Sequence, residues 1–144
     1  KRGFTNGIVL DMAGNVAETC SSNIFLAKDG VVSTPVPNGT FLAGITRFRT
    51  IQLLRNAGIK VEERTVKPAE LDEADEMFTT GNAGKVQPVN RYKNRDLQPG
   101  PIGRASASRA FSPSLGASPV SRKRGCESPV PRRGTRRMLS ALRS

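Results

Sequence analysis

Short apolar runs separated by turn signals dominate the first third of the chain. GIVLDM predicts a short buried strand over residues 8–10, and Gly14-Asn15 signals a turn before a second strand over residues 16–18. Residues 24–27 and 31–34 flank Asp29-Gly30, a strong signal for a two-residue hairpin turn. The pattern therefore predicts two antiparallel hairpins, and the Pro/Gly loop TPVPNGT ends the second one.

An amphipathic helix follows in GITRFRTIQLLRNAG. Its apolar positions recur at helical spacing, whereas its arginines are expected on other faces. Gly58 is expected to end the helix, because glycine adopts the left-handed conformation without strain. The apolar stripe consists of Ile45, Phe48, Ile51 and Leu54, widened by Leu53, and the arginines are Arg47, Arg49 and Arg55.

The next segments alternate between strand and helix signals. KVEERTV predicts an edge or half-buried strand, and KPAELDEA predicts a short helix with Pro68 in its first turn. DEMFTTGNAG predicts a strand that runs into a glycine-bracketed turn. KVQPVNRY predicts a last strand, in which Pro88 indicates a sheet edge or a bulge. Together these elements predict a mixed α/β (α+β) fold with antiparallel hairpins and packed helices.

Composition divides the 144 residues in two. Residues 1–100 carry 13 basic and 11 acidic side chains, whereas residues 101–144 carry 10 basic side chains and one acidic one. From Gly103 on, Ser, Arg, Pro, Ala and Gly dominate, and such a segment buries too little apolar area to offset its ordering entropy. We therefore expect a folded domain over residues 1–102 and a basic, disordered tail over residues 103–144.

The tail allows two interpretations. Its composition resembles out-of-frame translation of GC-rich DNA. It can also be a genuine extension that binds nucleic acid or an acidic partner through its charge. Nucleic acid is the less favoured partner, because Phe111 is isolated and no aromatic residues are interleaved for base stacking.

Several function classes are disfavoured by what the chain lacks. It has no histidine and only two cysteines, Cys20 and Cys126, which argues against a zinc site, a histidine-based catalytic site or a disulfide framework. No metal site is therefore expected, and a reducing cytoplasm is the expected compartment. No apolar stretch is long enough to span a bilayer, and no signal-peptide core is present.

Two turns carry the candidate chemistry. Gly44 stands just before the amphipathic helix, so the backbone N–H groups of Ile45 and Thr46 are expected in its first turn, free to bind an anion. TTGNAG is a second small-residue turn, in which Asn82 can offer a side-chain amide. Together the two turns can hold a phosphate from two sides, although each signal is also typical of an ordinary helix start or turn.

The run from Glu18 to Arg47 resembles the signature of the class IV pyridoxal-phosphate aminotransferases. The residues that carry the resemblance are Glu18, Cys20, Asn23, Ile24, Phe25, Val32, Thr34, Leu42, Gly44, Ile45 and Arg47. The surrounding segments VLDMAGNVAE, NGTFLAGITR, ADEMFTTGNAGKVQPV and RDLQPGPI are similar to bacterial branched-chain amino acid aminotransferases. The relatives of that family also include D-amino-acid aminotransferases and aminodeoxychorismate lyases, which stay open as alternatives.

The resemblance implies a large C-terminal domain of the D-amino-acid-aminotransferase type, with pyridoxal 5'-phosphate as cofactor. It implies transamination between Leu, Ile or Val and 2-oxoglutarate, so amino acids and 2-oxo acids are the expected substrates, and a homodimer or higher homo-oligomer in the full-length form. The alternative of another class is a non-catalytic module that binds through its basic tail.

The resemblance also implies residue roles. Glu18 pairs with the pyridine nitrogen and keeps it protonated, since a carboxylate favours the charged form of its neighbour. Asn23 holds the local turn. Leu42 packs on the ring, and Ala83 presents its backbone N–H to the substrate carboxylate. The phosphate contacts fall on Ile45, Thr46 and Asn82, and Gly44 is a further cofactor-binding residue.

No catalytic residue is expected within the chain. The Schiff-base lysine of the family is expected upstream of residue 1, together with a smaller N-terminal domain. Lys85 is interpreted as a surface charge. The chain is therefore expected to be inactive by itself.

Overall fold

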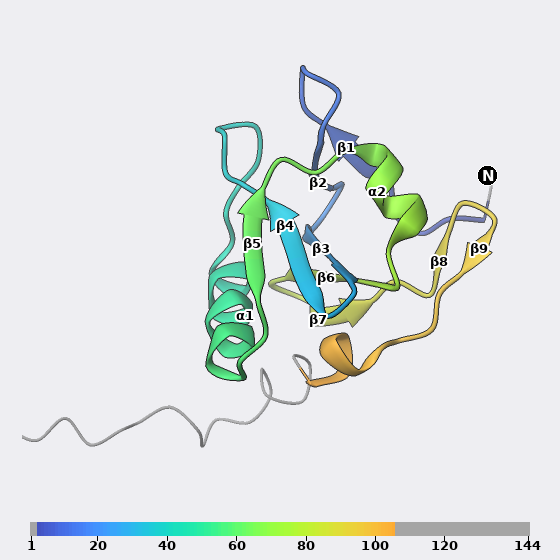
Figure 1. Ribbon diagram of the computed structural model, residues 1–144. Helices are drawn as coiled ribbons and strands as arrows, with labels where there is room; N and C mark the ends of the chain where they lie inside the picture. Colours follow the sequence, from blue (N-terminus) through green and yellow to red (C-terminus); the bar gives the residue numbers. More distant parts are fainter. Residues whose placement is uncertain (1–2, 106–144) are drawn as a thin grey trace, which may run out of the picture.

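The computed structural model describes residues 3–105. One mixed sheet lies between two helices, with two small two-stranded sheets beside it (Figure 1). The elements are β1 (Ile8–Leu10), β2 (Val16–Thr19), β3 (Asn23–Lys28), β4 (Val31–Pro35), α1 (Ile45–Asn56), β5 (Val61–Arg64), α2 (Pro68–Glu73), β6 (Glu76–Gly81), β7 (Lys85–Pro88), β8 (Arg91–Tyr92) and β9 (Arg95–Asp96).

Both predicted hairpins are confirmed. Strands β1 and β2 pair antiparallel, with Val9 opposite Glu18, and β3 pairs antiparallel with β4. The second hairpin turns at Asp29 and Gly30, whose φ angles are 51° and 78°. Two successive residues with positive φ form the turn whose twist matches the twist of the flanking strands, which explains why Asp-Gly is a strong signal.

The five-stranded sheet has the order β5-β4-β3-β6-β7. The expectation that β5 is an edge strand is confirmed, and Pro88 lies in the edge strand β7, where its missing N–H breaks no ladder. One pairing was not predicted: β4 and β5 run parallel. Two adjacent parallel strands need a crossover connection. Helix α1, which lies between β4 and β5 in the sequence, provides this connection and packs on one face of the sheet.

Alternate residues of β3 face two separate hydrophobic clusters. One cluster contains Phe25 and Phe78, whose rings stack with centroids 4.9 Å apart, and α1 covers it with Ile51 and Leu54. The other contains Ile24 and is covered by α2 and the β1–β2 hairpin. Its buried members are Val16, Ile24, Leu26, Val66, Leu71, Ala74, Met77 and Leu97. Burial on both faces explains why β3 is a continuous apolar run.

The predicted apolar stripe of α1 is half wrong. Ile51 and Leu54 are buried, but Ile45 and Phe48 are 76% and 58% exposed, and Arg47 is buried with 3% exposure. The buried guanidinium of Arg47 has partners: its Nη2 lies 2.9 Å from the Pro35 carbonyl oxygen and 3.0 Å from Glu63 Oε2. Because these acceptors lie far away in the sequence, helical spacing could not predict that an arginine faces inward.

Gly58 ends α1 as predicted. Its φ is 77°, the Ile59 N–H donates to the Leu54 carbonyl, and the Gly58 N–H donates to the Arg55 carbonyl. This pair of bonds is the Schellman motif, and the usual hydrophobic contact accompanies it, since Ile59 and Leu54 share one cluster.

The segment after β7 differs from the predicted long last strand. Strand β7 ends at Pro88, and residues 91–96 form a separate ribbon of β8 and β9, with Lys93 at φ 53° in its turn. Residues 101–105 are helical, so ordered structure crosses the boundary expected after residue 102. The predicted tail lies otherwise outside the described residues, and the two-part division stays a prediction. Within residues 3–105, no helix is long and apolar enough to cross a membrane.

Candidate functional site

The turn between β2 and β3 places Glu18 at one end of the central sheet. The Thr19 N–H donates to the Ser22 carbonyl at 2.8 Å, which closes the turn directly after Glu18. The Glu18 side chain is half-buried and forms no hydrogen bond or ion pair with any other residue of the described range. Its carboxylate therefore keeps its acceptor capacity for an external donor.

Asn23, the first residue of β3, connects this turn to the start of α1. Its Nδ2 donates to the Leu42 carbonyl at 2.9 Å, and its Oδ1 accepts the Gly44 N–H at 3.1 Å. These bonds tie the start of β3 to the loop before α1, and the expected role of Asn23 in holding its own local turn stays a prediction. Asn23 therefore links β3, which follows the turn after Glu18, to the start of α1.

The turn between β6 and β7 reaches the same end of the sheet. Thr80 pairs with Asn23 across the strands, and Gly81 lies so close to Ser22 that a Cβ on Gly81 would meet Ser22 Oγ at 3.1 Å. Asn82 and Ala83 follow directly and are exposed. The structure thus brings three segments together: the turn after Glu18, the start of α1 and the turn that carries Asn82.

The first turn of α1 leaves backbone donors open. Gly44 is the N-cap and supplies no side chain, and no acidic residue stands in the first turn. The backbone N–H groups of Ile45 and Thr46 and the Thr46 hydroxyl have no hydrogen-bond partner within residues 3–105. Free donors and the positive end of the helix dipole therefore point the same way, as an anion site requires.

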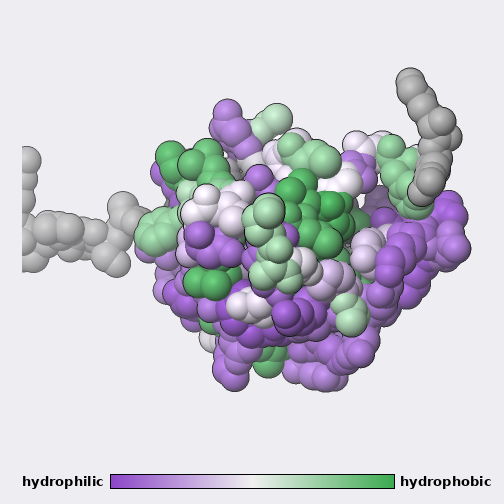
Figure 2. All heavy atoms as spheres, turned by 90° about the horizontal axis from the view of Figure 1, so that it is seen from above, coloured by the Kyte–Doolittle hydropathy of each residue, from purple (hydrophilic) through white to green (hydrophobic). Residues whose placement is uncertain are grey.

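The loop before α1 presents apolar surface beside these donors. Leu42 is 82% exposed, although its carbonyl is held by Asn23. Ile45 and Phe48 continue the exposed apolar surface along the helix. Hydrophobic residues that reach the surface between hydrophilic ones are also visible in the view from above (Figure 2).

The residues expected to hold pyridoxal phosphate fit that group. A phosphate needs several donors without internal partners, an aromatic ring needs an apolar side chain, and a pyridinium needs a carboxylate. The α1 start, Leu42 and the unpartnered Glu18 supply these three kinds of group at one end of the sheet. Their individual roles stay predictions.

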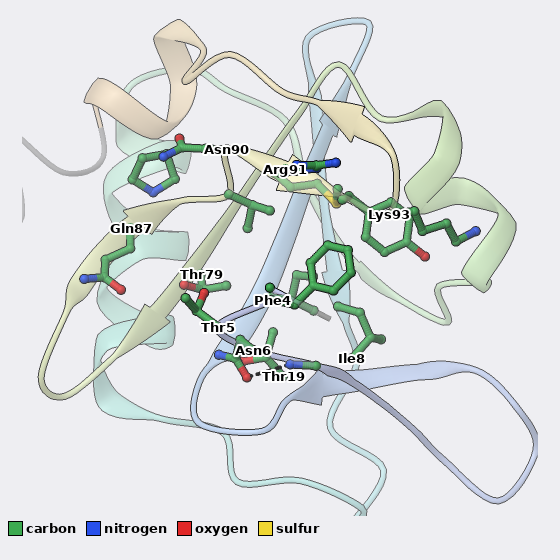
Figure 3. Close-up of a pocket in the computed structure, with 17 residues that line it drawn as sticks. Phe4, Thr5, Asn6, Ile8, Thr19, Thr79, Gln87, Asn90, Arg91 and Lys93 are labelled. Atoms are coloured by element: carbon green, nitrogen blue, oxygen red, sulfur yellow. Dashed lines mark hydrogen bonds between the residues drawn. The ribbon is translucent and has the colours of Figure 1, made fainter. Parts of the chain in front are cut away.

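One cavity lies away from these residues. It has a volume of about 460 Å³ and is lined by residues of the N-terminal segment, by Thr79 and Met77 of β6 and by residues 87–93 (Figure 3). Phe4 stands in the middle of these residues in the close-up. None of the predicted site residues lines this cavity. Ile24 and Met77 in its lining belong to the cluster under α2, so it opens on the sheet face opposite α1.

The ion pairs with shifted pKa values lie away from the candidate site. The Arg64 guanidinium and the Lys67 N–H hold the pKa of Glu70 below its ordinary value. The hydrogen bond to Glu73 raises the pKa of Lys28. Within residues 3–105, no cluster of three or more Asp, Glu, His or Cys side chains could hold a metal ion.

Sequence reasoning missed two contacts that shape the site. The approach of Gly81 to Ser22 joins residues that are far apart in the chain, and only the glycine itself was a signal. The burial of Arg47 anchors the first turn of α1 to β4 and β5. A basic residue at the close of the family signature was visible, but nothing in the sequence indicated that it points inward.

Comparison with known proteins identifies the class. The family described as "Amino-transferase class IV" matches residues 1–92. The chain therefore belongs to the class IV aminotransferases.

Two curated relatives are branched-chain-amino-acid aminotransferases. A probable branched-chain-amino-acid aminotransferase of Aquifex aeolicus is 44% identical over 102 residues, which cover 70% of this chain and 33% of that protein. The chloroplastic branched-chain-amino-acid aminotransferase 5 of Arabidopsis thaliana is 42% identical over 118 residues, which cover 79% of this chain and 28% of that protein.

A solved structure agrees with the fold. The crystal structure of an aminotransferase from Brucella abortus bound to the cofactor PLP is 50% identical and superposes with a TM-score of 0.73. It covers 74% of this chain and 38% of the Brucella chain. The chain thus spans about a third of the length of the proteins it resembles.

Proposed function

We propose that the chain forms the cofactor-binding part of a pyridoxal-phosphate-dependent aminotransferase that acts on branched-chain L-amino acids with 2-oxoglutarate. The carrying observation is the convergence of three segments of a class IV aminotransferase around Asn23. One segment bears the open donors of α1, one bears Glu18 and one bears Asn82.

Each group of the site has one task in this proposal. The N–H groups of Ile45 and Thr46, the Thr46 hydroxyl and Asn82 donate to the phosphate. Leu42 packs on one ring face and excludes water from it. Glu18 holds the proton on the pyridine nitrogen, because its carboxylate favours the charged form of that nitrogen.

Pyridoxal phosphate, when bound, supplies an electron sink for the bonds at the substrate Cα. Ala83 presents its backbone N–H to the substrate carboxylate. Branched-chain substrates are favoured over D-amino acids and aminodeoxychorismate by the relatives named above and by the segments TGNAGKVQPV and RDLQPGPI.

The catalytic lysine is proposed to lie outside residues 3–105. Four lysines of this range are engaged in polar contacts, with Lys28 paired to Glu73, Lys60 to Glu62, Lys93 to Asp72 and Lys67 to the Asn15 side chain. Lys85, which pairs with Gly81 at the start of β7, has no side-chain partner in this range. It is therefore the lysine that an experiment must exclude as the catalytic residue. The chain by itself is proposed to bind the cofactor without turnover.

The exposed apolar surface of Leu42, Ile45 and Phe48 supports a contact with further protein in the assembled enzyme. A homodimer or higher homo-oligomer is the proposed assembly. The enzyme is proposed to be soluble and cytoplasmic.

Cofactor binding is tested by adding pyridoxal phosphate to the purified chain and following backbone amide shifts by NMR. The amides of Ile45 and Thr46 should move, whereas those of the cavity residues Phe4 and Tyr92 should not. Pyridoxal without its phosphate is the matched ligand, and it should leave Ile45 and Thr46 nearly unmoved. Shifts confined to the cavity would reject the proposed site.

The lysine assignment is tested on the same complex. Borohydride reduction followed by peptide mapping should label several exposed lysines weakly, with no turnover of leucine. Stoichiometric labelling of Lys85 together with leucine turnover would show that Lys85 is the catalytic residue.

The substrate is tested with a protein that carries this segment at the length of its relatives. Branched-chain L-amino acids should donate to 2-oxoglutarate faster than D-amino acids do. Salt-sensitive binding of DNA without any transamination would favour the basic binding module instead.

A further inference from the structure

Asn23 touches both parts of the proposed site without facing solvent. The residue is 6% exposed, and its side-chain amide donates to Leu42 and accepts from Gly44. Leu42 is the proposed ring contact, and Gly44 immediately precedes the proposed phosphate donors. The proposed ring contact and the proposed phosphate donors therefore both depend on one buried side-chain amide.

The loop that carries these groups has few other attachments. Residues 37–43 are otherwise tied to the described protein by the hydrogen bond from Asn38 Nδ2 to Asp11 Oδ2, 3.2 Å long and exposed. The remaining side-chain bonds in the loop, between Thr40 and Asn38, are internal to it. The hydrogen bonds of the buried Asn23 consequently fix the position of the end of the loop and of the start of α1 relative to the sheet.

The fit between Asn23 and Gly44 is tight. A Cβ placed on Gly44 would lie 3.0 Å from Asn23 Oδ1. The φ of −67° and ψ of 152° at Gly44 are open to any residue, so glycine is needed there for the close approach and not for its backbone conformation. An alanine at this position requires the Asn23 side chain to move by a few tenths of an ångström.

We propose that Asn23 is a positioning residue that sets the affinity for the cofactor by fixing Leu42 and the first turn of α1 relative to β3. It contacts no ligand atom itself. The inference rests on the proposed function, since it concerns the same site. Removal of Asn23 frees the loop, so the ring contact and the phosphate donors lose their fixed separation.

The test compares two buried side chains of the same sheet. Asn23→Leu removes both hydrogen bonds at nearly constant shape. Thr34→Val is the matched control, because Thr34 is fully buried and its Oγ1 donates to the Ile24 carbonyl at 2.8 Å, away from the loop. Each variant of the full chain is titrated with pyridoxal phosphate and with inorganic phosphate, following the Ile45 and Thr46 amides, and its thermal midpoint is recorded.

Asn23→Leu should weaken binding of pyridoxal phosphate by about tenfold, a typical effect of removing a group that orients a ligand-binding residue. Thr34→Val should lower the thermal midpoint and leave both affinities unchanged. Equal affinities for the wild type and Asn23→Leu would overturn the inference while leaving the proposed function intact. Absence of any shift at Ile45 and Thr46 in the wild type would instead reject the proposed function.

Gly44→Ala tests the same contact from its other side, and it carries the test if Asn23→Leu does not fold. Alone it should weaken pyridoxal phosphate binding by a few-fold, because the displaced Asn23 holds the loop less well. In an Asn23→Ala background, where no side-chain atom remains at the Oδ1 position, it should have no further effect, since contacting residues are not additive. Unchanged affinity in Gly44→Ala, or two effects that multiply, would contradict the inference.

Discussion

The first turn of α2 is closed by the protein's own side chains, whereas the first turn of α1 is left open. In α2, Pro68 occupies the first position, the Glu70 carboxylate accepts the Lys67 N–H at 2.7 Å, and Arg64 binds the same carboxylate with two nitrogens. In α1, glycine is the cap, no acidic residue stands in the first turn, and the N–H groups of Ile45 and Thr46 have no partner within residues 3–105.

The difference separates stability from binding. A side-chain cap stabilises a helix by about 1 kcal/mol, so α1 forgoes a gain that α2 has. What α1 keeps is a set of donors that a ligand can use. Instead, Asn23 and the buried Arg47 attach the first turn of α1 to the central sheet. Local stability rules are broken where a site is proposed and obeyed where none is, as expected for functional positions.

The largest change in stability is expected when Arg47, which attaches the first turn of α1 to the sheet, is replaced. Arg47→Ala should lower the free energy of unfolding by about 3 kcal/mol, because it leaves the Pro35 carbonyl without its guanidinium partner and creates a cavity. Arg49→Ala, at an exposed position of the same helix, is the control and should stay within about 0.5 kcal/mol. Urea unfolding measures both, and equal values for the two variants would show that Arg47 does not anchor the turn.

Replacement of Glu70 at the start of α2 should lower the free energy of unfolding more than the partial exposure of its side chain suggests. Glu70→Ala removes the acceptor of the Lys67 N–H and the partner of Arg64, so we expect a loss of about 1.5 kcal/mol. The matched control is Glu73→Ala in the same helix, whose ion pair with Lys28 is exposed and should contribute about 0.5 kcal/mol or less. Denaturant midpoints decide, and a larger loss for Glu73→Ala would be contrary to this account.

The open start of α1 can be closed by a single charge. Ile45→Asp places a carboxylate in the first turn, where it should stabilise the helix by about 0.5 kcal/mol through the dipole. The same charge repels phosphate, so binding of pyridoxal phosphate should fall by about tenfold, or about 1.4 kcal/mol. Ile45→Asn has similar size without charge and separates the two effects. Tighter binding by the aspartate variant would refute an anion site at this turn.

The sequence predicted the local features of the fold well. Asp29-Gly30 and Gly58 require positive φ, and each lies where such a residue was expected. Strand and helix runs followed from periodicity for the same reason: the signal and the structure it specifies lie within a few residues.

Features that depend on distant partners were missed. The inward orientation of Arg47 depends on Pro35 and Glu63, and the exposure of Ile45 and Phe48 follows from it. The parallel pairing of β4 and β5 depends on how α1 packs. For the site, the residues came from the family resemblance, while the convergence on Asn23 came from pairing between strands that the sequence did not specify.

The smallest effect concerns the charge at the start of α2 and its dependence on pH. The Arg64 guanidinium and then the Lys67 N–H lower the pKa of Glu70 in the folded chain. A carboxyl whose folded pKa is lowered adds stability above its unfolded pKa, and this contribution is lost as the pH falls through the folded pKa. Glu70→Gln keeps an acceptor for the Lys67 N–H but has no charge.

At neutral pH, Glu70→Gln should therefore be less stable than the wild type by about 0.5 kcal/mol, a small value because the ion pair is partly exposed. This difference should shrink as the pH falls below the ordinary range of a glutamate and vanish once Glu70 is protonated in the folded chain. Urea unfolding of both proteins across that range measures it. A difference that grows toward low pH would mean that the charge of Glu70 opposes folding, and α2 would then not be the internally satisfied counterpart of α1.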